Sequence, residues 1–220
     1  MSLAVWNRRH FIAAGLFAGL SAGCIAAWAA PESTVLVVGD SLSAEYGLKR
    51  GSGWVALLQQ RLQEQKIAAR IVNASISGDT TSGGRSRLPP LLKQHNPDVV
   101  VIELGANDAL RGLPLQMTED NLTQMAATAQ KAGARVLLVG VEVPPNYGSE
   151  YANRFLGLYG KVAKSTRSAL APSLLAGIAD DPDPLRWFQP DRIHPKAEAH
   201  PRMLDNVWPE LKKLLTASKK

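Results

Sequence analysis

The chain is organised around the stretch Val35-Leu36-Val37-Val38-Gly39-Asp40-Ser41-Leu42-Ser43. Its first four residues form a continuous apolar run, which predicts a strand buried on both faces of a parallel sheet. The Gly-Asp-Ser turn then delivers the Ser41 hydroxyl to the end of this strand. Such a hydroxyl acts as a nucleophile only with a general base within hydrogen-bond reach and donors for the resulting oxyanion. Because Gly-Asp-Ser is also an ordinary strand-ending turn, the rest of the chain must supply these partners.

Strands and helices alternate along the rest of the chain. Apolar runs predict strands over residues 69–76, 98–104 and 136–141, and a short fifth strand over residues 173–178. Helical spacing of apolar residues predicts helices over about 54–65, 118–132 and 151–162, and after Pro195 to about Leu215. A polar segment runs from Ser77 through Pro89-Pro90 to a stop at Asn96-Pro97. This rhythm predicts an α/β fold, with one parallel sheet of about five strands covered by helices on both faces.

Three turns follow predicted strands and are expected to meet in space. Ser41 follows the first strand, Gly78 the second and Asn107 the third. The carboxyl ends of parallel strands form one edge of a sheet, and ligands of α/β proteins bind at that edge. The alternation therefore predicts a single site there.

The first thirty residues have the pattern of an export signal. Arg8 and Arg9 precede an uncharged stretch over residues 11–30 and, with Phe11 behind them, resemble a twin-arginine signal. An ordinary Sec signal is the alternative. Small residues at 27–29 favour cleavage before Ala30, which divides the chain into a signal peptide, residues 1–29, and one domain, residues 30–220. We therefore expect a periplasmic or secreted protein.

Cys24 is the only cysteine and offers a second interpretation of the export signal. Residues 20–24 resemble a lipoprotein signal cut before Cys24, which would anchor the protein through a lipid, although Ser21 stands where such signals usually have an apolar residue. Cleavage at Ala29 instead leaves no cysteine, hence no disulfide or cysteine metal ligand. The apolar run is rich in Ala and Gly and ends at Pro31, so we expect no membrane span in the mature protein.

Composition and charge fit one globular domain. Of the 220 residues, 45% are hydrophobic, enough for a full core. Losing Arg8 and Arg9 leaves 23 of the 25 Lys and Arg residues against 19 Asp and Glu, a formal net charge of +4 in place of +6. Apart from the Lys219-Lys220 tail these charges are spread out, so we expect no nucleic-acid partner, and we expect a monomer.

His194 is the histidine best placed to serve as the base. It lies in Gln189-Pro190-Asp191-Arg192-Ile193-His194-Pro195, where two prolines stiffen the turn. Asp191, three residues earlier, can accept a hydrogen bond from one ring nitrogen and leave the other for Ser41, as in a serine hydrolase triad. The alternative is that Asp191 merely caps the last helix. His95 and His200 are expected to be structural.

Gly78 and Asn107 are the candidate oxyanion donors. The Asn107 amide is a neutral donor, and Gly78 has no side chain to keep its backbone N–H away from a substrate. With the backbone N–H of Ser41 they would make three donors. Taken singly, each is as well explained as a turn residue.

Together these blocks resemble those of the SGNH (GDSL) hydrolases. They occur in the family's order and rough spacing, and residues 103–104, 110–112 and 145–148 make the match closest to the exported bacterial thioesterase I, lysophospholipase and arylesterase branch. The four blocks are Gly39-Asp40-Ser41-Leu42-Ser43, Ser77-Gly78-Asp79-Thr80, Gly105-Ala106-Asn107-Asp108 and Asp191-Arg192-Ile193-His194-Pro195.

The resemblance implies a three-layer α/β/α sandwich similar to flavodoxin and a serine ester hydrolase without cofactor or metal. It implies Ser41 as nucleophile, Gly78 and Asn107 as oxyanion donors, His194 as base and Asp191 as its partner. The expected substrate is a small-molecule acyl ester or thioester, lysophospholipids included. The chain departs from the family's pattern at two positions where close relatives often have glycine, Ala106 and Arg192, which puts substrate preference in doubt rather than activity.

An apolar loop predicted over residues 109–117 leaves the sheet edge beside Asn107. Its leucines follow neither a helical nor an alternating pattern, so they have no evident place in the core. We expect this loop and the loop around Pro144 to form the walls of an acyl groove. The expected substrate-binding residues are Leu110, Leu113, Pro145 and Tyr147. The alternative is that these side chains only pack on one another.

The sequence also leaves three other functions open. A metal-dependent phosphoesterase would use a set of Asp, Asn and His ligands, but two-metal sites usually draw on more histidines. A small-acyl (acetyl) esterase of the same family is the second, and a catalytically silent binding protein is the third. The silent protein would have lost a Ser, Asn or His of the blocks, and none is lost. The ligands considered for the phosphoesterase are Asp40, Asn107, Asp108, Asp191 and His194.

Overall fold

A computed structural model describes residues 32–143 and 145–217, together with Met1. The predicted signal peptide and its cleavage site lie outside the described residues. Five parallel strands form one sheet in the order β2-β1-β3-β4-β5, as the alternation predicted. The strands are β1 (Ser33–Gly39), β2 (Ala69–Asn73), β3 (Val99–Glu103), β4 (Arg135–Val139) and β5 (Ala169–Ala171).

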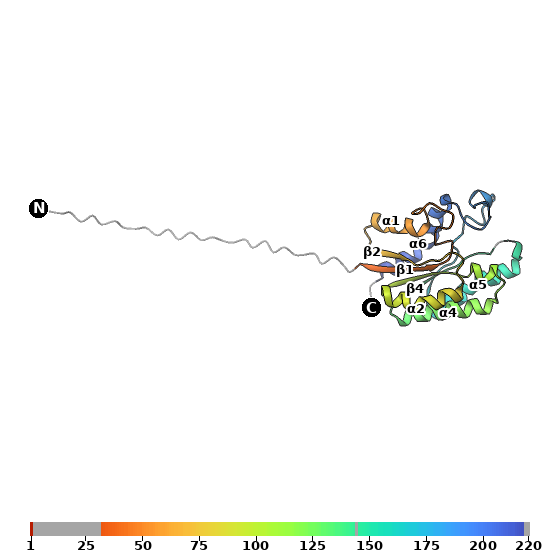
Figure 1. The fold of residues 1–220 in the computed structure, drawn as a ribbon, viewed down its shortest axis with the longest axis horizontal. Coiled ribbons are helices and arrows are strands. Elements are labelled where there is room, and N and C mark those ends of the chain that lie inside the picture. The colour runs from red at the N-terminus through yellow and green to blue at the C-terminus, as the bar shows by residue number, and fades with distance from the viewer. Residues whose placement is uncertain (2–31, 144, 218–220) are drawn as a thin grey trace. The chain divides into compact units, whose positions relative to one another are not determined.

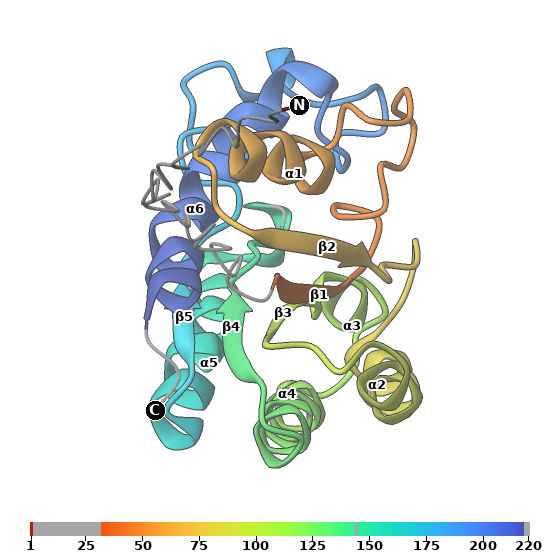
Figure 2. The ribbon, with the colours of Figure 1, turned by 90° about the vertical axis from the view of Figure 1, so that its left-hand side faces the viewer.

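Helices cover both faces of the sheet and complete the predicted three layers. Helices α1 and α6 pack together on one face, and α2, α4 and α5 lie side by side on the other (Figures 1 and 2). The helices are α1 (Trp54–Glu64), α2 (Thr81–His95), α3 (Ala106–Leu110), α4 (Leu115–Lys131), α5 (Ser149–Thr166) and α6 (His200–Thr216), with the short 3-10 helices η1 (Pro145–Tyr147), η2 (Pro184–Arg186) and η3 (Ala197–Ala199).

The central strands are buried on both sides. Residues 35–38 of β1 and 99–102 of β3 have no exposed surface, which explains their continuous apolar sequence. Gly39 and Glu103 are paired at the ends of these two strands. The chain moves from β1 outward to β2 and then returns to the other side of β1 as β3, so the topological switch point lies between β1 and β3. Both the Ser41 turn and the Asn107 turn begin there.

The predicted fifth strand is wrong in position. Residues 173–178 form turns, and β5 is the three-residue strand before them. Pro172 follows β5 directly and has no N–H for a further ladder bond. The leucines and isoleucine of residues 173–178 are nevertheless buried, because Leu174 N–H donates to Gly140 O at 2.8 Å and holds the turn against the core.

The segment before residue 96, for which only a polar pattern was identified in the sequence, contains helix α2 with Pro89 and Pro90 inside it. Both prolines are exposed, and so are Arg85 and Ser86, whose carbonyl groups lose their helical partners. Solvent can satisfy these carbonyls, so the helix continues to His95.

The predicted loop over residues 109–117 is largely helical. Leu110 ends α3, and α4 begins at Leu115, three residues before the predicted start at Thr118. Thr118 does not begin the helix; it is buried on the inner side of α4, 3.4 Å from an Asp108 oxygen. None of the helices in the described part of the chain is both long and apolar enough to span a bilayer.

Candidate active site

The Ser41 turn is held by the two residues beside it. The Asp40 carboxylate is fully buried and accepts the Leu42 N–H at 3.0 Å, which closes the turn. The buried Ser43 hydroxyl donates to Glu103 Oε2 at 2.6 Å and accepts the Trp54 indole N–H at 3.2 Å. The turn is therefore anchored in the core on both sides of Ser41.

Ser41, His194 and Asp191 form one hydrogen-bonded chain. His194 Nε2 lies 2.9 Å from Ser41 Oγ, and His194 Nδ1 lies 2.7 Å from Asp191 Oδ2. Burial raises the pKa of Asp191, but hydrogen bonds from the backbone N–H groups of His194 and Ile193 and from the His194 ring outweigh it, and the net pKa is below the usual value. Asp191 is thus an anion facing the imidazole, as a base-orienting residue must be.

Arg192 adopts the conformation that glycine would adopt at this position. Its φ is +59°, in the left-handed region. The turn is closed by Asp191 Oδ1, which accepts the N–H groups of Ile193 and His194 at 2.9 and 3.0 Å. These bonds hold Arg192 in a conformation that is strained for a residue other than glycine, and nothing in the structure explains why arginine replaces glycine here.

Asn107 lies at the start of α3 and is linked to the nucleophile turn. Its Nδ2 donates one hydrogen to Asp40 Oδ2 at 3.0 Å, which leaves the second amide hydrogen free for a ligand. Gly105, just before, has a φ of +132° and would bring a Cβ within 2.3 Å of the Tyr159 hydroxyl oxygen, so only glycine fits there. Ala106 follows without strain as the first residue of α3.

The Gly78 loop is fixed by two arginines. Gly78 has a φ of +78°, and its carbonyl accepts from Arg111 Nη2 at 2.7 Å. Arg87 pairs with Asp79 at 2.7 Å and also donates to the carbonyls of Gly39 and Ala74. Arg87 therefore ties the ends of β1 and β2 to the loop that carries Gly78.

A second link spans the loops of Gly78 and Asn107. Asp108 is fully buried and accepts the Thr81 N–H at 2.8 Å as well as the Thr81 hydroxyl. Asn121 of α4 in turn donates to the Thr81 hydroxyl at 3.0 Å. This network sets the start of α2, three residues after Gly78, against the residue next to Asn107.

Two buried carboxyl groups lie beneath the turn. Burial raises the pKa of Asp40 from 3.8 to about 7, against hydrogen bonds from Leu42 and Asn107 that lower it. Burial, and next the negative charge of Asp40, raise the pKa of Glu103 well above its usual value. Glu103 Oε1 is buried without a hydrogen-bond partner. Like charges so close disfavour ionisation of both groups at neutral pH.

The candidate phosphoesterase ligands are bonded in other ways and are not grouped as a metal site. Asp108 is bound to Thr81, Asp40 to Asn107, and Asp191 to His194. Among residues 32–143 and 145–217, no three His, Cys, Asp or Glu side chains gather as a metal site.

Of the four predicted substrate-binding residues, Leu113 lines a cavity and Tyr147 lies beside one of its lining residues. Leu113 lines a cavity of about 550 Å³ between α4 and α5, together with Tyr151 and Leu158. The Tyr147 ring lies 5.7 Å from the Tyr151 ring and so adjoins this cavity. Leu110 is 39% exposed, and Pro145 begins η1. The Leu113 N–H donates to Asp108 O at 2.9 Å, which connects the groove to the Asn107 turn.

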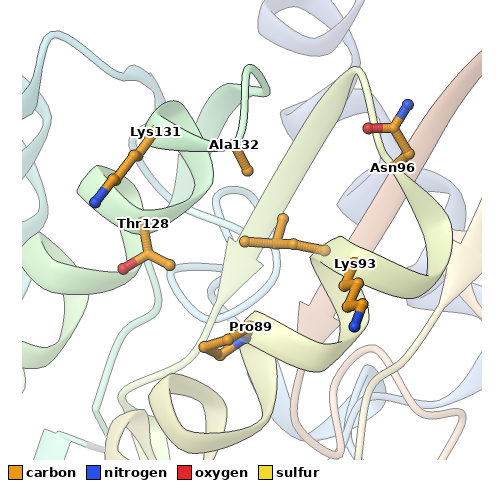
Figure 3. A pocket seen from close by; sticks show the side chains of 7 residues that line it. Pro89, Lys93, Asn96, Thr128, Lys131 and Ala132 are labelled. Carbon is orange, nitrogen blue, oxygen red and sulfur yellow. The ribbon is translucent and has the colours of Figure 1, made fainter.

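A second cavity, of about 480 Å³, lies between α2 and α4 and is shown in Figure 3. It is formed at the C-terminal ends of both helices, which lead back to the amino edge of the sheet. This cavity therefore lies away from Ser41. Its lining residues are Pro89, Leu92, Lys93, Asn96, Thr128, Lys131 and Ala132.

Sequence reasoning missed the residues that support the site. Tyr46 and Gln189 contact the His194 region, Arg87 fixes the Gly78 loop, and Glu103 anchors Ser43. These residues carry no sequence motif of their own, and their partners lie far away in the chain. His200 is buried and accepts the Trp54 N–H at 2.9 Å.

Comparisons with known proteins agree with the geometry. Residues 37–202 match the model of the GDSL-like Lipase/Acylhydrolase family. The chain is 49% identical over 200 residues to Esterase TesA of Pseudomonas aeruginosa, covering 89% of this chain and 98% of that protein. It is 41% identical over 187 residues to Thioesterase 1/protease 1/lysophospholipase L1 of Escherichia coli, covering 85% and 87%. The crystal structure of esterase EstA from Pseudoalteromonas sp., inhibited by monoethylphosphonate, aligns with a TM-score of 0.77 at 37% identity, covering 84% and 100%.

Proposed function

The chain belongs to the GDSL-like lipase/acylhydrolase family and is a carboxylic ester hydrolase, and we propose that Ser41 is its nucleophile, His194 its general base and Asp191 the partner of that base. The observation that carries this proposal is the continuous hydrogen-bonded chain from Ser41 Oγ through both ring nitrogens of His194 to Asp191. A base must lie within hydrogen-bond reach of the proton that it removes, and this one does.

The reaction proceeds through an acyl-enzyme. Ser41 Oγ attacks the substrate carbonyl carbon while His194 Nε2 takes the hydroxyl proton, and the imidazolium is stabilised by the Asp191 anion. The carbonyl oxygen becomes an oxyanion that accepts from the backbone N–H groups of Ser41 and Gly78 and from the free N–H of Asn107. His194 then gives the proton to the leaving alcohol or thiol. Water, activated by His194, releases the acid and restores Ser41.

The acyl chain occupies the groove of Leu113 and Tyr151, with Leu110, Pro145 and Tyr147 at its walls. This proposal is supported by the cavity between α4 and α5 and by the hydrogen bond that joins Leu113 to Asp108, next to the oxyanion donor Asn107. Medium-length acyl esters and thioesters fit such a groove, and lysophospholipids are included because the Escherichia coli relative has that activity in its name. Each buried methylene contributes about 0.8 kcal/mol.

The enzyme works outside the cytoplasm. The support is the signal pattern of Arg8, Arg9 and the uncharged stretch over residues 11–30, with a lipid anchor at Cys24 as the alternative. Cell fractionation of the full chain, with mass spectrometry of the mature N-terminus, distinguishes the two.

The test of the mechanism is covalent labelling. A fluorophosphonate should add one mass to the peptide containing Ser41, and Ser41→Ala should lose both the label and activity by several orders of magnitude while remaining folded. Thr216→Ala, at the end of α6, is the matched control, because its hydroxyl only bonds Lys212 O. Labelling at another residue, or turnover by Ser41→Ala, would contradict the assignment.

A further inference from the structure

Tyr46 lies against the ring of His194. The two ring centroids are 4.3 Å apart with an interplanar angle of 37°. Tyr46 itself is 50% exposed, so it has no place in the hydrophobic core that would explain its position. Besides Ser41 and Asp191, it is a third side chain in contact with this imidazole.

The backbone at Tyr46 is held in place from one side by Glu45. Glu45 has a φ of +60°, in the left-handed region, and its carboxylate accepts the N–H groups of Gly51 and Gly53 at 3.0 and 2.8 Å. These bonds close the loop that follows Ser41. An exposed loop that is fixed by its own carboxylate can present a side chain in one orientation.

Gln189 holds the same backbone from the other side. Its Nε2 donates to Tyr46 O at 3.0 Å and to Pro195 O at 3.1 Å, and its backbone N–H donates to His194 O at 2.8 Å. A Cβ at Gly47 would come within 2.2 Å of Gln189 Oε1, so glycine is required for this approach. One glutamine therefore joins the loop after Ser41 to the loop of His194.

We propose that Tyr46 is a positioning residue for His194, which keeps the imidazole directed at Ser41 and stabilises its protonated form during turnover. The inference rests on the proposed function, because it requires His194 to gain a proton in the reaction. A cation within about 6 Å of an aromatic centroid is attracted to the face of the ring, and the imidazolium formed in each half-reaction meets this condition. The anion of Asp191 acts from the Nδ1 side, and Arg192, two residues before His194, is exposed; a substitution at Tyr46 alters neither of these residues.

The experiment compares Tyr46→Leu and Tyr46→Phe in the full chain. The cation–ring attraction predicts that Tyr46→Leu lowers kcat by about two- to fivefold with little change in KM. The loss should be equal for an aryl and an alkyl ester of the same acyl group, because His194 acts in both acylation and deacylation. The acidic limb of the kcat/KM profile should move to lower pH, since the protonated imidazole is less stable without the ring. Tyr46→Phe should restore wild-type behaviour.

Several results would overturn the inference. Unchanged turnover by Tyr46→Leu, an equal loss in Tyr46→Phe, or a loss confined to aryl esters would each assign the ring another role. Should Tyr46→Leu unfold, Gln189→Leu keeps the ring but removes the side-chain hydrogen bonds to Tyr46 O and Pro195 O, and it should lower kcat in the same way. Full activity of Gln189→Leu would refute the positioning role of Tyr46. Ser41→Ala is assayed in parallel, because activity of that variant would instead refute the proposed function.

Discussion

Acid should weaken the fold through His200, the first residue of α6. His200 is 2% exposed, its Nδ1 accepts the Trp54 N–H at 2.9 Å, and its Nε2 is buried without a partner. Burial lowers the pKa of His200 from 6.5 to about 4, although the nearby Pro195 backbone and the charge of Glu45 act to raise it. Between these two pH values His200 is protonated in the unfolded chain but neutral in the folded protein.

The size and sign of the effect follow from these two values. Stability from the neutral ring is fully present above about pH 6.5 and is lost as the pH falls toward and through about 4. One unit of pKa corresponds to about 1.4 kcal/mol, so the free energy of unfolding should fall by about 3 kcal/mol by pH 4 because of His200 alone.

The assay is urea unfolding of the wild type and of His200→Asn at about pH 8 and about pH 4. Asparagine places an oxygen where Nδ1 was and can still accept the Trp54 N–H, but it does not titrate. The variant loses packing at both pH values, so the informative quantity is the change with pH. Asp40 and Glu103 have raised pKa values and act with the opposite sign, but equally in both proteins. The same loss on acidification in both proteins would refute the argument.

Three further predictions concern catalysis. Asp191→Asn should lower kcat much more than it raises KM, because the Asp191 carboxylate orients and stabilises the His194 imidazolium. Steady-state kinetics with unchanged kcat would show that Asp191 has only a structural role. Asn107→Ala should lower kcat by about a hundred- to a thousandfold, because one oxyanion donor is lost; a rise in KM with unchanged kcat would contradict this. Leu113→Asp should depress kcat/KM for octanoyl esters and spare acetyl esters, whereas an equal loss on both, or a wild-type preference for acetate, would show that the groove does not hold the acyl chain.

The elements that could be predicted are those with a local signal. The runs at residues 35–38 and 99–102 are buried on both faces of the sheet, so their continuous apolar sequence identified β1 and β3. The order of the strands then brought Ser41 and Asn107 to one edge. The short edge strand β5 gave no comparable signal, since two of its three residues are only partly buried. The burial of Leu174 and Ile178 in turns imitated a strand instead.

The support of the site could not be predicted, because it depends on partners far apart in the chain. Asp108 follows Asn107 and could have been read as another polar turn residue, yet it is fully buried and bonds Thr81, 27 residues earlier. Its two hydrogen bonds set the distance between the turns that supply the proposed oxyanion donors. Tyr46 and Gln189 lie 143 residues apart and meet only because β1 and the loop before α6 end at the same edge. Catalytic side chains can be recognised in the sequence by their chemistry. The residues that position them cannot, because only their contacts in the folded protein distinguish them from other residues of the same type.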